Sequence, residues 1–270
     1  MLANQHVAFI GGGHISEIII HNLTQGRVVP EEQIVVSDPE PSRRLHLSDR
    51  FGITIAADNV EAAQRGDLVM ICVRPEVVKA VLPDLKAARL RPEQVIVSVA
   101  AGIPLSTYRP LGDQQPLVRA LPNPPSQVGQ GIAPLVFAGA VNSEQRELVL
   151  ALFSALGDVV EVEESYLDAI TSLSSPVTTY LYFQSLIDAG VACGLPRPVA
   201  TQVAAQTITG SMAVWQARQI SPSELIREAS TPGGVSIESL NVLEEHEFKA
   251  AVVAAITHGA ARATELGRDT

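Results

Sequence analysis

The sequence predicts an α/β protein in which a doubly wound parallel-sheet domain (residues 1–163) is followed by an all-helical domain (residues 164–270). Three observations predict this organisation. Short apolar runs alternate with helical segments in the first part, which is typical of parallel strands covered on both faces. A glycine-rich turn follows the first apolar run. After about Ser165 the strand-like runs nearly vanish, and small residues in helical patterns take their place.

Short apolar runs predict the strands of the first domain, and the segments between them are expected to be helices. The predicted strands are His6–Gly11, Gln33–Ser37, Thr54–Ala56, Leu68–Val73, Gln94–Val99, Leu117–Leu121, Ile132–Ala138 and Val159–Glu163.

The second domain is predicted to be helical throughout. Leu167–Ala192 indicates one long helix with a disturbance at Pro176, and the Gly-Leu-Pro-Arg-Pro segment after it indicates a break. Because the helices carry little charge, they are expected to leave apolar surface that pairs in a homodimer, with room for a higher assembly. The remaining predicted helices are Val199–Gln219, Ser221–Glu228 with Ser221 as N-cap, Ser236–Glu244 and Phe248–Leu266.

Composition and charge exclude several classes of protein. Hydrophobic residues make up 46% of the chain, which suffices for a substantial core. No apolar run reaches the ~18 residues of a membrane span, and no signal peptide is expected. The net charge of −10 argues against nucleic acid as a partner. Cys72 and Cys193 are predicted to be buried free thiols, which favours a reducing, cytoplasmic location. Histidine and cysteine spacing predicts no metal site.

The glycine-rich turn predicts a dinucleotide-binding loop of the Rossmann type. It has the pattern G-x-G-x-x-S, between a strand and a helix expected over Ser16–Leu23. Gly11 permits the tight turn, Gly13 lets the backbone approach a pyrophosphate, and the small Ser16 lets helix pack on strand. His14 either contacts the cofactor or substrate or faces solvent in the first helical turn.

The end of the second strand predicts the cofactor's adenosine site. Ser37 and Asp38 lie there, and an acid at this position binds the ribose hydroxyls and repels a 2′-phosphate. This favours NADH over NADPH. Arg43 and Arg44 follow, and they either pair with a 2′-phosphate or form a solvated helix face.

Other strand ends and one loop offer further contacts. Val73-Arg74-Pro75 and Ala100-Ala101-Gly102 end the fourth and fifth strands, at the edge where ligands collect. Asn123, held between prolines, either donates to the nicotinamide half of the cofactor or stabilises a rigid turn. Thr231–Ser236 has two glycines that allow close backbone approach. Its Ser236 either serves the site or is simply a helix N-cap.

In this order, the segments FIGGGHIS, CVRP, SVAAGI, RALPNPP, DAITSLSS, AGVACGLPR and STPGGVSIESL resemble delta-1-pyrroline-5-carboxylate reductase from end to end. The resemblance implies an enzyme that passes a hydride from NAD(P)H to a cyclic imine, giving L-proline. It also implies a Rossmann domain plus a helical dimerisation domain, with the site at the dimer interface.

The resemblance implies a role for several residues. Gly11, Gly13, His14 and Ile15 would line the pyrophosphate, and Ser37, Asp38 and Asn59 would surround the adenosine ribose. Val73, Arg74 and Pro75, with Ala100, Ala101 and Gly102, would lie beneath the nicotinamide half. Thr231 and Ser236 would be the catalytic hydroxyls beside Gly233 and Gly234, with Ser236 bonded to the imine nitrogen.

One stretch departs from the family pattern. The family signature is roughly L-S-G-S-G-P-A-Y, and here Leu173–Tyr180 is LSSPVTTY. In the family this backbone helps to hold the substrate carboxylate, so the expected substrate contacts are Ser174, Ser175, Thr178 and Thr179, together with Gly233 and Gly234 of the second loop. Branched residues narrow that pocket, and Val235 replaces the usual threonine in the second loop.

Three hypotheses follow. The first is reduction of 1-pyrroline-5-carboxylate, and the second is reduction of a different cyclic imine in specialised metabolism. The third is a non-catalytic dinucleotide-binding or sensor protein, against which the retained Thr231 and Ser236 argue.

Overall fold

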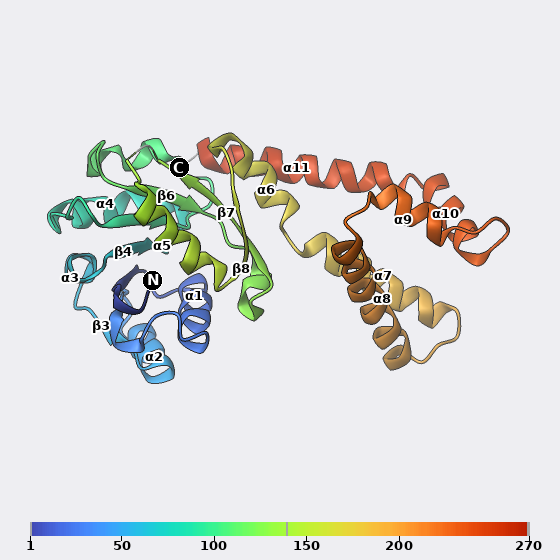
Figure 1. The fold of residues 1–270 in the computed structure, drawn as a ribbon, viewed down its shortest axis with the longest axis horizontal. Helices are drawn as coiled ribbons and strands as arrows, with labels where there is room; N and C mark the ends of the chain where they lie inside the picture. Colours follow the sequence, from blue (N-terminus) through green and yellow to red (C-terminus); the bar gives the residue numbers. More distant parts are fainter. Residues whose placement is uncertain (1, 139, 269–270) are drawn as a thin grey trace. The chain divides into compact units, whose positions relative to one another are not determined.

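An eight-stranded sheet forms the centre of the N-terminal part of the chain (Figure 1), in the order β3-β2-β1-β4-β5-β6-β7-β8. The protein is described from a computed structural model that covers residues 2–138 and 140–268. All eight predicted strands are confirmed, mostly with shorter ends. They are β1 (Val7–Ile10), β2 (Ile34–Ser37), β3 (Thr54–Ile55), β4 (Leu68–Ile71), β5 (Val95–Ser98), β6 (Leu117–Ala120), β7 (Gly131–Phe137) and β8 (Gly157–Glu161).

The direction of the last two strands corrects the prediction of an all-parallel sheet. β1 to β6 run parallel, but β7 pairs antiparallel with β6, and β8 runs parallel to β7. Only residues 121–130 connect β6 to β7, and a parallel return needs a crossover of about a dozen residues or more. The short connection therefore reverses the chain.

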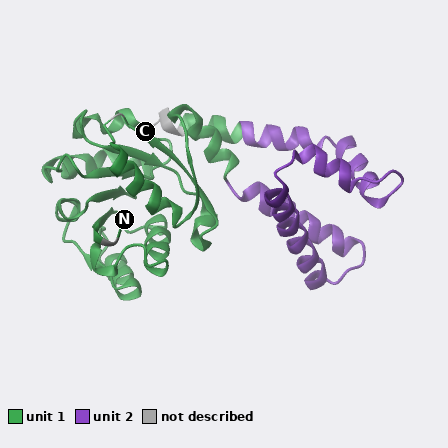
Figure 2. Cartoon of the chain, viewed as in Figure 1, with its two compact units in different colours: residues 1–174, 258–270 green, residues 175–257 purple. Residues whose placement is uncertain are grey.

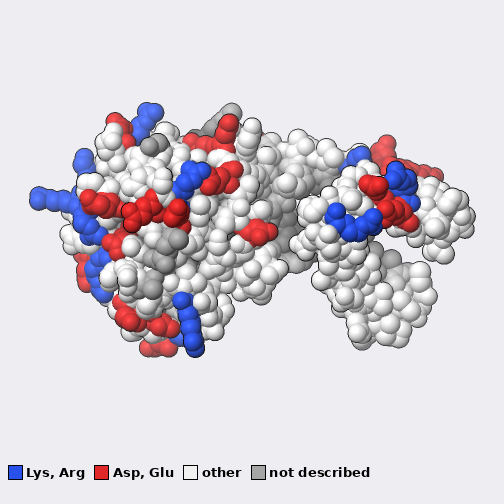
Figure 3. All heavy atoms as spheres, viewed as in Figure 1, with Lys and Arg blue, Asp and Glu red and all other residues white. Residues whose placement is uncertain are grey.

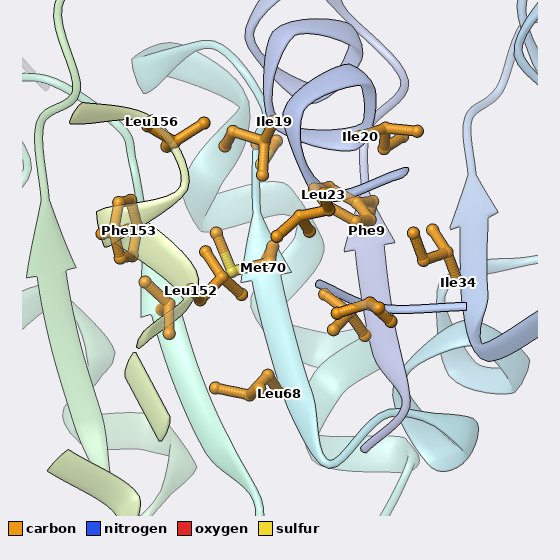
Figure 4. Close-up of a cluster of buried hydrophobic side chains, with 14 of the residues drawn as sticks. Phe9, Ile19, Ile20, Leu23, Ile34, Leu68, Met70, Leu152, Phe153 and Leu156 are labelled. Carbon is orange, nitrogen blue, oxygen red and sulfur yellow. The ribbon is translucent and has the colours of Figure 1, made fainter. Parts of the chain in front are cut away.

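Helices cover both faces of the sheet. One face packs against α1 (His14–Gln25), α2 (Pro41–Phe51) and α5 (Ser143–Ser154), and the other against α3 (Asn59–Arg65) and α4 (Val78–Ala87). Figure 4 shows the first face, where side chains of β1 and β4 meet those of α1 and α5. The strands are buried on both faces, which is why they appear in the sequence as continuous apolar runs.

The chain divides into two compact units, shown in Figure 2. Unit 1 comprises Met1–Ser174 and His258–Thr270, and unit 2 comprises Ser175–Thr257. The division lies later in the chain than the predicted boundary at 163/164, because α6 (Leu167–Leu173) and the end of α11 (Phe248–Arg268) both belong to unit 1. Thr264 of α11 donates a hydrogen bond to the carboxylate of Asp168 in α6 at 2.8 Å.

The C-terminal helices differ from the predicted ones at two places. The expected single helix over 167–192 is interrupted at residues 174–176, because Pro176 cannot donate a backbone hydrogen bond and begins a new helix instead. Gly234, not Ser236, is the N-cap of α10, so Ser236 lies in its first turn. The helices after α6 are α7 (Val177–Ala192), α8 (Arg197–Arg218), α9 (Pro222–Ala229), α10 (Val235–Glu245) and α11.

Unit 2 leaves much apolar surface uncovered in the single chain, as the sequence predicts. Helices α7 and α8 pack together through Ile187, Ala200 and Ala204. Asp188 and Arg197 are the charged residues between 177 and 217, and most of the face of unit 2 seen in Figure 3 is uncharged. The exposed apolar side chains of these two helices include Val177, Tyr180, Leu181, Val199, Val203, Met212 and Val214. This surface suits a second protein chain.

Candidate functional site

A cavity of about 830 Å³ lies at the carboxyl ends of β1, β2 and β4. This is the edge at which open α/β sheets bind ligands. Eight of the predicted cofactor residues line it, namely Gly11, Gly13, His14, Ser37, Asp38, Asn59, Val73 and Arg74. The structure adds residues that sequence patterns did not single out as cavity lining, among them Pro39, Ala57, Asp58, Cys72, Val77, Val81 and Asp84.

The glycine loop has the geometry that its pattern predicts. Gly11 has φ +96°, and a Cβ there would lie 2.9 Å from both the Cys72 carbonyl oxygen and Val73 Cγ1. A Cβ on Gly13 would meet no atom within 4 Å, because this residue borders the cavity. Ser16 is buried and donates to the Gly11 carbonyl at 2.5 Å. Gly13 caps α1 without a side-chain hydrogen bond, so the first amides of this helix remain available to a phosphate.

Asp38 is tied to the glycine loop. One carboxylate oxygen accepts from the Gly12 N–H at 2.7 Å, and the other from the Glu40 N–H at 2.9 Å. Arg43 donates to the Gly12 carbonyl and to Glu17, and Arg44 lines the cavity while donating to the Ala57 carbonyl at 3.1 Å. The solvated-face interpretation of these arginines is therefore wrong, since both hold neighbouring backbone.

A chain of hydrogen-bonded polar side chains runs along one part of the cavity wall. Ser37 donates to Asn59 Oδ1 at 2.8 Å, and Asn59 donates to Asp84 Oδ2 at 2.8 Å. Asp84 lies on α4, which covers the opposite face of the sheet from α1. No pattern near it in the sequence points to a ligand. Three carboxylates therefore lie along the cavity, those of Asp38, Asp58 and Asp84.

Cys72 is buried in the cavity wall beside Ser16. Burial raises the pKa of its thiol to about 12, although the hydrogen bond with Ser16 works against this. The thiol therefore stays protonated at neutral pH and is a poor nucleophile. Cys193, by contrast, is exposed in the single chain, so the prediction of two buried thiols is correct only for Cys72. Its position after the last turn of α7, in unit 2, leaves it without covering residues.

Glu17 joins α1 to α2 behind the glycine loop. Its carboxylate forms ion pairs with Arg43 and Arg50 and lies 3.4 Å from His46 Nε2. Burial raises the pKa of this carboxyl, but hydrogen bonds from Arg43 and His46 and the two arginine charges outweigh it. The pKa thus lies below the ordinary value of 4.5.

The replacement Glu17→Gln is expected to lower the melting temperature at pH 7. A carboxyl whose pKa is lower in the folded state stabilises the fold above its unfolded pKa, and this stabilisation is lost as pH falls through the folded pKa. Thermal unfolding between pH 7 and pH 3 should therefore show a difference from wild type that shrinks below about pH 4.5. Glu32→Gln, an exposed site, is the control. A Glu17 difference that stays constant with pH would contradict this role.

The remaining predicted cofactor residues lie outside this cavity. Ile15 packs against the core, Pro75 begins a short helical turn, and Ala100 is buried. Ala101 follows Ala100 and lies in a turn with Gly102. Gly102 lines a second cavity of about 370 Å³, together with Pro104, Arg119, Glu164, Ser165, Asp168 and Thr264.

Both polar atoms of the Asn123 side chain form hydrogen bonds within the protein. Its side chain donates to the Ser174 carbonyl at 3.0 Å and accepts from the Ile132 N–H at 2.8 Å. These bonds favour the rigid-turn interpretation over a contact with the nicotinamide half. They also hold Ser174 at the end of α6, where the first segment of unit 1 ends.

The predicted substrate residues fall in two segments. Ser174 caps α6, Ser175 follows it, and Thr178 and Thr179 lie in the first turn of α7. In unit 2, Thr231, Gly233 and Gly234 form a tight turn closed by a hydrogen bond from the Gly234 N–H to the Thr231 carbonyl at 3.0 Å. Gly233 has φ +71°, a conformation that favours glycine. Ser236 follows on α10, exposed to solvent.

The described residues show neither a metal site nor a membrane-spanning helix. Within 2–138 and 140–268, no group of three or more His, Cys, Asp or Glu side chains is placed to hold a metal ion. None of the helices in the same residues has the length and hydropathy to cross a membrane.

Comparisons with known proteins assign the family. A model described as pyrroline-5-carboxylate reductase dimerisation matches residues 164–266, and one described as NADP oxidoreductase, coenzyme F420-dependent, matches residues 6–102. A pyrroline-5-carboxylate reductase from Synechocystis sp. is 32% identical over 97% of this chain and 98% of its own length. One from Corynebacterium melassecola is 35% identical over 97% and 98%. The chain belongs to the pyrroline-5-carboxylate reductase family.

Solved members of the family share the whole fold. A pyrroline carboxylate reductase from Plasmodium falciparum, with NADP bound, superposes with a TM-score of 0.87 at 25% identity, over 99% of this chain and 100% of that one. The pyrroline-5-carboxylate reductase from Coxiella burnetii gives 0.90 at 27% identity, over 97% and 98%. The protein is thus an oxidoreductase with a nicotinamide dinucleotide as cofactor. The predicted fold class, a Rossmann-type sheet followed by a helical dimerisation domain, is confirmed.

Proposed function

We propose that the protein reduces 1-pyrroline-5-carboxylate to L-proline. The observation that carries this proposal is the cavity at the glycine loop, in a chain that matches pyrroline-5-carboxylate reductases over nearly its full length. The residues fit a dinucleotide. Gly13 leaves open space where a pyrophosphate would approach, and the uncapped amides of α1 face the same place.

The reaction needs a hydride, a proton and a held substrate. The bound cofactor supplies the hydride to the imine carbon, and the nitrogen gains a proton. The amides at the start of α7 and at the start of α10, neither of which has a side-chain cap, suit the substrate carboxylate. Ser236, in the first turn of α10, is our candidate to hydrogen-bond the ring nitrogen and relay its proton from water, with Thr231 in the adjoining turn.

The direct test is turnover. Purified protein, 1-pyrroline-5-carboxylate and NADH or NADPH should give L-proline, followed by cofactor absorbance and chiral amino-acid analysis. Tight dinucleotide binding without turnover of any cyclic imine would refute the proposal and favour the non-catalytic alternative.

A second candidate is the reduction of a different cyclic imine. The break at 174–176 and the branched Val177 and Thr178 that follow it favour this candidate, because bulk in a pocket changes substrate choice by ~1–3 kcal/mol. A panel of cyclic imines with and without a carboxylate, run in the same assay, separates the two. The second candidate predicts a higher kcat/KM for an imine other than 1-pyrroline-5-carboxylate.

We infer that NADH is preferred over NADPH. Three carboxylates, those of Asp38, Asp58 and Asp84, line the cavity, whereas Arg43 and Arg44 are engaged by Glu17 and backbone carbonyls. An added 2′-phosphate would face this negative charge. Asp38→Asn removes one charge and keeps one acceptor oxygen, for the Gly12 N–H, while the bond from the Glu40 N–H is lost. The ratio of kcat/KM for NADH to that for NADPH should fall about tenfold. An unchanged ratio would contradict the inference.

The assembly we propose is a homodimer formed through the C-terminal helices. The exposed apolar faces of α7 and α8, and the match of residues 164–266 to a dimerisation model, support it. Two free thiols favour a reducing compartment, the cytoplasm.

A further inference from the structure

A buried polar network lies under the turn that follows β5. The hydroxyls of Ser98, at the end of β5, and Tyr108, in the helical turn Leu105–Leu111, form a hydrogen bond. Arg119 of β6 is next to Ser98 in the sheet register. Its side chain is only 5% exposed, and it forms an ion pair of 2.6 Å with Glu164. The network thus links β5, β6 and the segment that leads into α6.

The network fixes both ends of residues 100–105. At one end, the Ala100 N–H donates to Ser98 Oγ at 3.3 Å. At the other, the Leu105 N–H donates to Glu164 Oε1 at 2.7 Å, and the same oxygen accepts from Arg119. The turn between them includes Gly102 with φ +72°. Its backbone conformation therefore depends on polar groups beneath it.

The Tyr108 hydroxyl of this network keeps one protonation state. Burial raises the pKa of Tyr108 to about 12, with the Ser98 hydrogen bond and the Arg119 charge acting in the opposite direction. The hydroxyl therefore stays protonated and able to donate throughout the assay range. Arg119 Nε has no hydrogen-bond partner among the described residues, so the Glu164 carboxylate is the main compensation for burying this guanidinium.

We propose that Ser98, Tyr108, Arg119 and Glu164 are positioning residues, which hold the backbone of residues 100–105 in the shape that the nicotinamide half of the cofactor lies against. The inference rests on the proposed function and on the position beside Ala100–Gly102 that the family resemblance implies for the nicotinamide half. The adenosine half would occupy the separate cavity lined by Ser37, Asp38 and Asn59. Loss of the network should therefore affect one half of the cofactor and spare the other.

The test compares two ligands on two conservative variants. Tyr108→Phe removes one hydroxyl, and Glu164→Gln removes the charge that pairs with Arg119. Calorimetric titration should show NADH affinity reduced about tenfold, as expected when a buried hydrogen bond is lost, with ADP-ribose affinity unchanged. In steady-state assays the KM for NADH should rise more than kcat falls.

The matched controls are Tyr166→Phe and Glu163→Gln, which remove the same groups from exposed neighbours and should leave both affinities unchanged. The proposal would be overturned if Tyr108→Phe bound NADH as tightly as the wild type. It would also be overturned if the affinities for NADH and ADP-ribose fell equally. If Glu164→Gln does not fold, Tyr108→Phe decides alone. Failure of the proposed reaction is distinguishable, because it appears as absent L-proline in the wild type while the two ligands still bind.

Discussion

Replacing Gly13 by valine is expected to abolish dinucleotide binding without unfolding the protein. Gly13 has φ −68° and ψ −172°, which any residue adopts, and a Cβ there meets nothing within 4 Å. The fold therefore accepts the side chain. The new methyl groups would project into the cavity where the pyrophosphate approaches, so NADH affinity should fall on the order of 100-fold, about 2.7 kcal/mol. Calorimetric titration measures the loss.

Gly11 provides the contrast in the same loop. With φ +96° and two atoms 2.9 Å from an added Cβ, Gly11→Ala strains the backbone itself and should lower both the melting temperature and the affinity. Gly13→Val should shift the melting temperature by no more than about 4 °C, since only the helix N-cap preference changes. Undiminished NADH binding by Gly13→Val would mean that the cavity is not the cofactor site.

The second large effect is expected from Ser236→Ala. The hydroxyl lies exposed in the first turn of α10, and we propose that it holds the imine nitrogen and relays its proton. Removing a group with this role costs on the order of 100-fold in rate, so kcat/KM for 1-pyrroline-5-carboxylate should fall by that factor. NADH affinity should not change, because the proposed contact of Ser236 is with the imine and not with the cofactor.

Ser239→Ala is the matched control on the same helix. The Ser239 hydroxyl donates to the Val235 carbonyl at 3.2 Å and is thus used within the helix. This variant should keep nearly full activity. If Ser236→Ala retained the kcat/KM of the wild type, the proposed proton relay would be wrong.

Sequence patterns predicted the strands and the glycine loop because both depend on local rules. A strand buried on both faces must be apolar along its length, and a positive φ with a close neighbour at Gly11 requires glycine. The direction of β7 was missed because it depends on what residues 121–130 can span in space.

Side-chain partners were harder to predict than backbone. Asp84 reaches the cavity from α4, and Asn123 bonds to Ser174, which is distant in sequence. Neither residue has a local signal for these contacts, since tertiary packing creates them. The helix break at 174–176 was underestimated for another reason. Proline is compatible with a helix start as well as with a kink, so the pattern alone did not choose between them.

The end of α11 belongs to unit 1, and this constrains the order in which the protein folds during its synthesis. Unit 1 is built from Met1–Ser174 and His258–Thr270, and Thr264 bonds to Asp168 across this gap in the chain. On the ribosome, the sheet and its helices emerge first, yet the contacts of α6 with the end of α11 must wait for nearly the whole chain. A proteolytic cut in unit 2 would likewise separate two segments that fold together. Unit 2 is thus connected to unit 1 by two chain segments, one at residues 174 and 175 and one within α11.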